Sequence, residues 1–300
     1  MFHVRHALII GLLLTSTSML QSQTIYVSNS NASVTMCSQG GGETHFQNAV
    51  GFVQGLAFDA SGNLYVAAGD VFKLNHDGSR TGYAGFGAYG QGDSYGMAFD
   101  TLGNLYTSNI SGMSYNIFWI GKVAPGGGNA TVFAECYGSG ILDAPLGIAF
   151  DAKGNLFVAN SGNNTIAEFT PGGNGTVFAS TGLNHPMGLA FDSTGDLFVS
   201  NTDGNNIMKF TPEGNSTVFA STGLNNPMGL AFDSAGNLFV ADSGNRLIDK
   251  FTPDGTQSIF ATTAAYPMWI AIQPAPEPAT LSLLGLGALA MLRRKSRGRD

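Results

Sequence analysis

Six short phrases of the chain end in a position that could carry binding chemistry. The phrases read alike, as in LFVAN, LFVSN and LFVAD, and turn-forming residues follow most of them. The final positions are Asn29, Ala68, Asn109, Asn160, Asn201 and Asp242. A ring of amides and one carboxylate could bind a sugar or hold Ca²⁺ weakly. Asn and Asp also cap their own turns readily, so a ligand-binding face and a purely structural role are both open.

Histidines offer little for a metal centre. Beyond the first 23 residues the chain has three, and the repeat pattern places His45 in an outermost strand, His76 in a turn and His185 in a loop. A zinc site needs clustered ligands, which these positions do not supply. His185 alone is expected on the same face as the amide ring, and it joins that ring as a candidate ligand-binding residue.

The positions around the expected axis are mostly apolar. The residues entering the inner strands are Gln54, Tyr95, Leu146, Met187, Met228 and Met268. A second recurring set of carboxylates comprises Asp59, Asp100, Asp151, Asp192 and Asp233. These aspartates lack the spacing of a calcium-binding loop and are interpreted as turn residues on the opposite face. The sequence therefore predicts no catalytic residues, no metal ligands and no cofactor beyond the weak Ca²⁺ site.

The elements that position these residues are repeated. Five copies of one phrase begin at Gly55, Gly96, Gly147, Gly188 and Gly229, at spacings of 41, 51, 41 and 41 residues. A period near 40 with strand-like segments and tight turns is typical of β-propeller blades. A single blade cannot bury both faces of its sheet, so neighbouring copies must supply the core.

The two ends of the repeat region complete one another. Residues 24–28 match a second strand without its inner strand, and residues 270–272 match an inner strand without its followers. Pairing them closes the ring and removes exposed sheet edges. The sequence predicts an all-β, six-bladed propeller with four-stranded antiparallel blades over residues 24–273. Trp269 is expected to plug the closing strand. About ten extra residues in the second copy predict a bulging rim that includes Trp119.

The wording PxGLAFDxxGNLFVADSGNxxIxKFTPxG resembles the NHL repeat, most strongly in the last three copies. The resemblance covers nearly all of residues 24–273 and implies a six-bladed propeller of the TolB-like kind. Related propellers include gluconolactonases, which implies an alternative function as a metal-dependent lactonase or lyase. The matching positions here carry Met and Leu in place of the carboxylate and amide metal ligands that such an enzyme needs.

Both ends of the chain have the character of sorting signals. Residues 1–23 contain Arg5 and a short apolar run, as in a secretory signal peptide. Residues 274–300 form a Pro-rich spacer, a 14-residue apolar segment and an Arg-rich end. The order Pro276, Glu277, Pro278, apolar segment, Arg293 and Arg294 resembles the PEP-CTERM sorting signal, which is also catalogued as an ice-binding protein C-terminal domain. The resemblance implies export in a Gram-negative bacterium and an exosortase-type enzyme as partner. It also implies transient anchoring in the inner membrane, with membrane contact only through the tail.

The charge of the chain limits its possible partners, and the positions of its cysteines indicate whether a disulfide can form. The formal net charge is −7, and residues 24–273 hold seven basic against eighteen acidic residues. An acidic surface of this kind excludes nucleic acid as a partner. The two cysteines, Cys37 and Cys136, are expected to lie a whole blade apart and to remain free, partly buried thiols. We predict an exported, non-enzymatic propeller that binds a carbohydrate or a surface protein, or has a structural role, at the cell surface or in an exopolysaccharide matrix.

Overall fold

The computed structural model describes residues 24–38, 43–47, 53–75, 77, 79–86, 93–111, 117–137 and 140–274. The predicted signal peptide and the sorting residues Pro276, Glu277, Pro278, Arg293 and Arg294 lie outside the described residues. In the part of the chain that is described, no helix has the length and apolarity needed to cross a bilayer.

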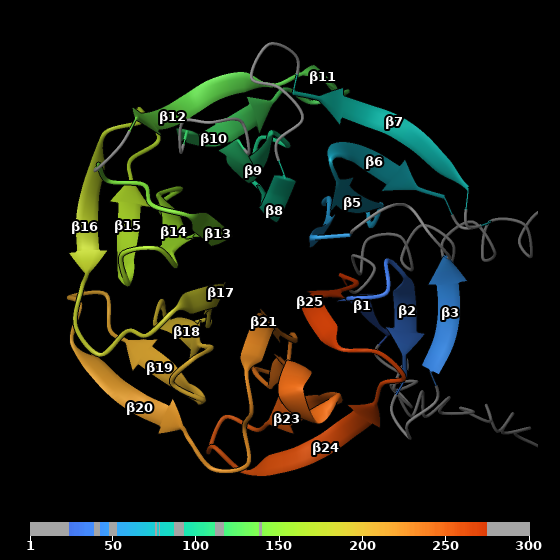
Figure 1. Cartoon of the computed structure of the whole chain (residues 1–300), viewed down its shortest axis with the longest axis vertical. Coiled ribbons are helices and arrows are strands. Elements are labelled where there is room, and N and C mark those ends of the chain that lie inside the picture. Colours follow the sequence, from blue (N-terminus) through green and yellow to red (C-terminus); the bar gives the residue numbers. More distant parts are fainter. Residues whose placement is uncertain are drawn as a thin grey trace, which may run out of the picture.

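Six sheets stand around a central axis like the blades of a propeller (Figure 1). Blade 1 contains β4 (Gly55–Phe58), β5 (Leu64–Ala68), β6 (Asp70–Leu74) and β7 (Arg80–Gly85). Blade 2 contains β8 (Asp93–Phe99), β9 (Leu105–Ser111), β10 (Ile117–Val123) and β12 (Thr131–Tyr137). Blade 3 contains β13 (Pro145–Phe150), β14 (Leu156–Asn160), β15 (Thr165–Phe169) and β16 (Gly175–Ala179). Blade 4 contains β17 (Pro186–Phe191), β18 (Leu197–Asn201), β19 (Asn206–Phe210) and β20 (Ser216–Ala220).

Blade 5 contains β21 (Pro227–Phe232), β22 (Leu238–Asp242), β23 (Leu247–Phe251) and β24 (Gln257–Thr262), with the 3₁₀ turn η2 (Ser243–Asn245) after β22. Blade 6 combines both ends of the repeat region: β25 (Pro267–Ile272), β1 (Ile25–Asn29), β2 (Val34–Cys37) and β3 (Glu43–Gln47) pair in that order. Val27 lies opposite Ile270 and Tyr26 opposite Ala271. The predicted fold and its closure by the two termini are confirmed.

A glycine at or before the middle of the inner strand lets blades 1 to 5 approach the axis. A Cβ atom on Gly55, Gly96, Gly147, Gly188 or Gly229 would lie within 3.0 Å of a carbonyl oxygen of the next inner strand. Real side chains do not reach such separations, so any larger residue would push the strands apart. This close approach explains why the repeated phrase begins with glycine.

Serine hydroxyls tie alternate blades to their neighbours. The residue directly before the ring position of each second strand is Ser in blades 2, 4 and 6 and Ala in blades 1, 3 and 5, where the ring positions are Asn29, Ala68, Asn109, Asn160, Asn201 and Asp242. In blade 4 the Ser200 hydroxyl accepts the N–H of Gly188 at 2.7 Å and donates to the carbonyl of Met228 at 2.6 Å. Ser108 makes the equivalent pair of bonds between blades 2 and 3. Each hydroxyl therefore satisfies buried backbone groups of two blades.

Aromatic side chains fill the interfaces near the other ends of the strands. The ring of Phe157 lies 5.0 Å from Phe178 of its own blade and 5.0 Å from Phe191 of the next, in edge-on geometry. The same triad recurs around Tyr26, Tyr65, Tyr106 and Phe198. Edge-to-face pairs add about 0.5–1.5 kcal/mol each beyond their buried area, so the recurring phenylalanines hold neighbouring blades together.

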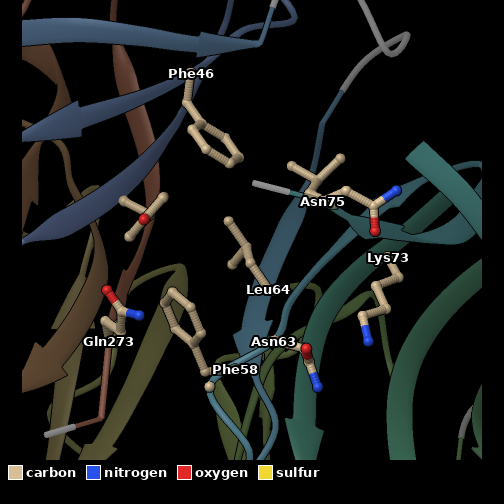
Figure 2. A pocket seen from close by; sticks show the side chains of 10 residues that line it. Phe46, Phe58, Asn63, Leu64, Lys73, Asn75 and Gln273 are labelled. Atoms are coloured by element: carbon tan, nitrogen blue, oxygen red, sulfur yellow. The ribbon is translucent and has the colours of Figure 1, made fainter. Parts of the chain in front are cut away.

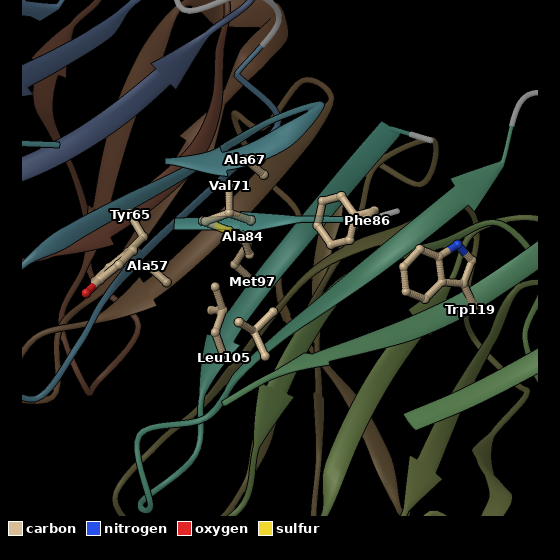
Figure 3. Close-up of a cluster of buried hydrophobic side chains, with 10 residues drawn as sticks. Ala57, Tyr65, Ala67, Val71, Ala84, Phe86, Met97, Leu105 and Trp119 are labelled. Atoms are coloured by element: carbon tan, nitrogen blue, oxygen red, sulfur yellow. The ribbon is translucent and has the colours of Figure 1, made fainter. Parts of the chain in front are cut away.

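Trp119 differs from its predicted place at a bulging rim. Its side chain is 1% exposed on β10 and meets Phe86 edge-on at 5.6 Å, inside the core between blades 1 and 2 (Figure 3). Blade 2 places part of its extra length in the sheet: β9, β10 and β12 have seven residues each, against five for the equivalent strands of blades 3 and 4. The prediction of a rim tryptophan was wrong because the insertion lengthened strands.

Another part of this copy extends the neighbouring blade. Residues Gly128 and Asn129 form the short strand β11, which pairs in parallel with β7 and makes blade 1 five-stranded. Cys37 lies on β2 as a buried, free thiol. Cys136 lies on β12, and its side chain is not among those that the structure describes. Blade 1 separates the two strands, as predicted.

Candidate functional site

One face of the ring carries the loops that enter the inner strands and the turns between second and third strands; we call it the loop face. The predicted amide ring lies at this end of the second strands, but its members are buried. Asn29, Asn109, Asn160, Asn201 and Asp242 are each 0–2% exposed. The side chains therefore lie beneath the loops of this face.

The hydrogen bonds of these residues hold the loop that precedes each inner strand. Asn160 Oδ1 accepts the N–H of Asp143 at 3.2 Å, and its Nδ2 donates to the carbonyl of Ile141 at 2.8 Å. Asn201 bonds the N–H of Asn184 and the carbonyl of Gly182 in the same way.

In the remaining blades the partners differ. Asp242 Oδ1 accepts the N–H of Asn225 at 2.8 Å. Asn109 accepts the Ser94 hydroxyl, and Asn29 donates to Ser33 and Thr35. Through these hydrogen bonds the buried ring has the structural role that was one of the two possibilities open from the sequence. Binding of a ligand by this ring stays a prediction.

Above the buried ring, blades 3 to 5 expose a second set of amides. It comprises Asn164, Asn184, Asn205, Asn225, Asn226 and Asn245, and we call it the amide arc. Asn164 and Asn205 adopt left-handed backbone angles, with φ of 58° and 51°. Asn tolerates this conformation better than most residues. The arc is therefore built from residues suited to tight turns.

Neighbouring loops lock together through this arc. Asn164 Oδ1 accepts the N–H of His185 at 2.7 Å, and Asn205 Oδ1 accepts the N–H of Asn226 at 2.7 Å. In blade 5 Arg246 takes the equivalent left-handed position, and its guanidinium lies 4.5 Å over the Tyr266 ring and donates to the Tyr266 hydroxyl at 3.0 Å. The exposed side chains thus project from a rigid frame.

An apolar collar closes the axis at this face. Leu146, Met187 and Trp269 are buried together, with Tyr95, Ile110, Met228 and Met268 packed against them. Beneath the collar lies a cavity of about 70 Å³, lined by apolar side chains that include Leu56, Ile148 and Leu230. Trp269 fills the mouth of the channel, as its predicted packing role requires.

His185 directly precedes β17, two residues before Met187 of the collar. Its side chain is half-buried, and Nδ1 is buried without a hydrogen-bond partner. His45 lies on the outer strand β3, and His76 is outside the described residues. Within the described segments, no group of three or more His, Cys, Asp and Glu side chains is arranged to hold a metal ion.

A buried pair of carboxyl groups was missed at the sequence level. Asp249 on β23 is 1% exposed, and its neighbour Asp242 is fully buried. Burial, followed by the charge of Asp242, raises the pKa of Asp249 to about 7. Burial also raises the pKa of Asp242. Blades 3 and 4 carry Ala167 and Met208 at the position of Asp249. A carboxyl group in LIDKF, where TIAEF and NIMKF have apolar residues, was therefore the sequence feature that could have revealed the pair.

The recurring turn aspartates cap their own turns. Asp233 Oδ1 accepts the N–H groups of Ala235 and Asn237 at 2.9 and 2.8 Å. Asp59, Asp100, Asp151 and Asp192 repeat these bonds. Their hydrogen bonds are those of the turn residues that the sequence predicted.

Comparisons with known proteins give matches for both the propeller and the C-terminal tail. Residues 274–297 match the PEP-CTERM protein-sorting motif. A search of curated proteins gives no match. Among solved structures, a chain of a nidogen/laminin complex superposes with a TM-score of 0.70 at 18% identity, covering 84% of this chain and 98% of the other.

Lyase structures share the same fold. A streptogramin B lyase gives a TM-score of 0.63 at 19% identity, with 82% of each chain covered. A catalytically inactive variant of virginiamycin B lyase from Staphylococcus aureus with quinupristin gives 0.62 at 18% identity, covering 85% of this chain and 94% of the other. Identities this low establish the propeller fold alone. The chain is thus a six-bladed β-propeller followed by a PEP-CTERM sorting motif.

Proposed function

We propose that this propeller is a non-enzymatic binding protein, and that its amide arc binds a carbohydrate outside the cell. The sorting motif implies export and processing by an exosortase-type enzyme. Its destination in this proposal is the cell surface or the exopolysaccharide matrix of a Gram-negative bacterium, after removal of the predicted signal peptide at residues 1–23. A surface protein is the second kind of partner that the arc could serve.

The observation that carries the proposal is the exposed, interlocked set of asparagines on blades 3 to 5. An amide side chain carries two donors and an acceptor, which complement the hydroxyl groups of a sugar. Asn164, Asn205 and Asn245 use part of this capacity within the frame. The loops that carry them are bonded to one another, as in Asn205 to Asn226. A rigid site loses little conformational freedom on binding. The stacked pair Arg246 and Tyr266 ends the arc with an exposed aromatic ring.

A glycan array probed with the exported protein tests this proposal. Asn184→Ala and Asn225→Ala remove exposed amides and should weaken binding of the same glycans. Asn215→Ala is the matched control, because Asn215 is an exposed asparagine in a turn between third and fourth strands, away from the arc. Unchanged binding in both arc variants would contradict the proposal. Replacing Asn160, Asn201 and Asp242 with Ala tests the predicted ring, and unaltered binding would rule it out.

The alternative is a lactonase or lyase of the metal-dependent propeller type. One observation favours it: virginiamycin B lyases share the fold, and a catalytically inactive variant of one carries a change of a histidine to alanine. His185, with its unpartnered Nδ1, is the candidate here. Turnover of quinupristin or a small lactone that His185→Ala abolishes would establish the enzyme, as would one tightly bound metal equivalent required for turnover. No turnover with added divalent metal refutes it.

A further inference from the structure

A pocket of about 150 Å³ opens at the seam between blade 6 and blade 1, on the face opposite the loop face. Its apolar wall consists of Tyr26, Phe46, Phe58, Leu64 and Leu74. Figure 2 labels three of these side chains, Phe46, Phe58 and Leu64. Polar groups on its border come from Gly62, Asn63, Lys73, Asn75 and Gln273. The pocket combines aromatic surfaces with amides at its edge.

One departure from the repeat creates space under Phe46. In blades 3 to 5 the third strand ends in Phe169, Phe210 and Phe251, each of which meets an aromatic ring of the preceding blade at 5.7–6.3 Å. The third strand of blade 1 ends in Leu74. Leucine is shorter than phenylalanine, so this position fills the seam beside Phe46 less completely than the phenylalanines fill the seams before blades 3 to 5.

A second departure removes a proline. In blades 2 to 5 a glycine of the turn between the first and second strands faces a proline of the turn between the third and fourth strands. The distance from the Cβ position to the proline Cγ is 3.7 Å for Gly103 and Pro125 and 3.8 Å for Gly154 and Pro171. It is 3.8 Å for Gly195 and Pro212 and 3.5 Å for Gly236 and Pro253. In blade 1 the sequence reads Asn75-His76 in place of Thr-Pro or Ala-Pro. His76 lies outside the described residues, and among the described atoms none comes within 4 Å of the Cβ position of Gly62.

The sorting motif starts beside this pocket. Gln273 is part of its border, and the exposed Pro274 follows it. The sequence continues with Pro276 and Pro278. Three extended residues span about 10 Å, so the tail is long enough for Pro276 to reach a pocket that Gln273 already touches. Proline-rich segments are preset in an extended helix and bind grooves lined by aromatic rings.

We propose that residues 274–278, the start of the sorting motif, dock into this pocket of their own chain. The apolar wall comes from β1, β3 and blade 1, whereas Gln273 follows β25, so the tail lies beside the pocket only when β25 pairs with β1 and closes the ring. Docking therefore couples the presentation of the sorting motif to completion of the propeller, a role separate from the binding function of the loop face.

Photo-crosslinking in the full chain tests the docking. A benzophenone amino acid replaces the exposed Ser61, which adjoins Gly62, and mass spectrometry identifies the residues it captures. The matched control carries the same group at Lys153, the equivalent position of blade 3, where Pro171 is present. We expect intramolecular crosslinks to residues 274–279 from position 61 only.

Filling the pocket supplies the second arm. Leu74→Phe restores the ring found in blades 3 to 5 and should reduce the crosslink about tenfold, which corresponds to roughly 1.4 kcal/mol of docking free energy. Pro276→Ser combined with Pro278→Ser should reduce it similarly without touching the propeller. The proposal is overturned by absence of a tail crosslink, by equal crosslinking from position 153 or by persistence in Leu74→Phe. Crosslinks that join two chains would also overturn it, because the occupant would then be another molecule.

Discussion

Asp249→Asn should make the propeller more stable at pH 8 and leave its stability at pH 4 nearly unchanged. The side chain is 1% exposed on β23, opposite Val240 and beside Asp242, and one of its oxygens has no partner. Because burial and the Asp242 charge raise its pKa to about 7, Asp249 holds a proton that the unfolded chain releases near pH 4. Asparagine keeps the shape and a donor toward Asp242 but cannot ionise.

The sign follows from proton binding. Between about pH 4 and pH 7 the folded state binds more protons than the unfolded state, so the free energy of unfolding falls as pH rises. A pKa difference of about three corresponds to about 4 kcal/mol, lost across this window and absent in the variant. The raised pKa of Asp242 acts in the same direction.

Urea unfolding at pH 4, 6 and 8 measures the effect. The difference between Asp249→Asn and the parent should grow with pH toward about 4 kcal/mol at pH 8. Asp203→Asn removes one negative charge from an exposed turn and is the matched control for net charge. A gain that is the same at all three pH values, or an equal gain in Asp203→Asn, would refute the reasoning.

Three further outcomes follow from the packing. Gly188→Ala should cost about 1–3 kcal/mol in urea unfolding because its Cβ would strike the Met228 carbonyl, whereas Gly82→Ala, with nothing within 4 Å, should change stability little; equal effects would contradict the close-approach argument. Trp269→Ala should cost about 3–5 kcal/mol by opening the collar, and a smaller loss would mean the plug is loosely packed. Cys37, with a pKa raised to about 11 by burial, should resist thiol reagents at pH 8 until the protein unfolds; rapid labelling of the folded protein at this residue, mapped by mass spectrometry, would disprove its burial.

The fold could be predicted because one repeat unit states its own geometry five times. Every copy has a glycine in its inner strand and an aspartate in its first turn, and the last copies have a phenylalanine in each strand. The geometry of a blade requires these residue types at these positions. The closing strands were found by matching fragments to the repeat, since the missing strand at one end was present at the other.

Positions where the chain departs from the repeat were harder to interpret. Trp119 was placed at a rim because extra residues commonly form loops, yet here they lengthen strands and bury the ring. Asp249 could not be distinguished from other strand residues, because its burial and its proximity to Asp242 depend on the folded blade. The exposed amides of the loop face were likewise hidden in the same Asn-rich phrases as the buried ring beneath them.

The most direct test of this account is amide hydrogen exchange of the two strands that close the ring. Closure holds Trp269 in the collar of the loop face and brings Gln273, where the tail begins, to the pocket between blades 6 and 1. The account predicts that peptides covering Ile25–Asn29 and Pro267–Ile272 are protected as strongly as those covering Pro145–Asn160 of blade 3. Fast exchange in the closing strands while blade 3 stays protected would contradict it.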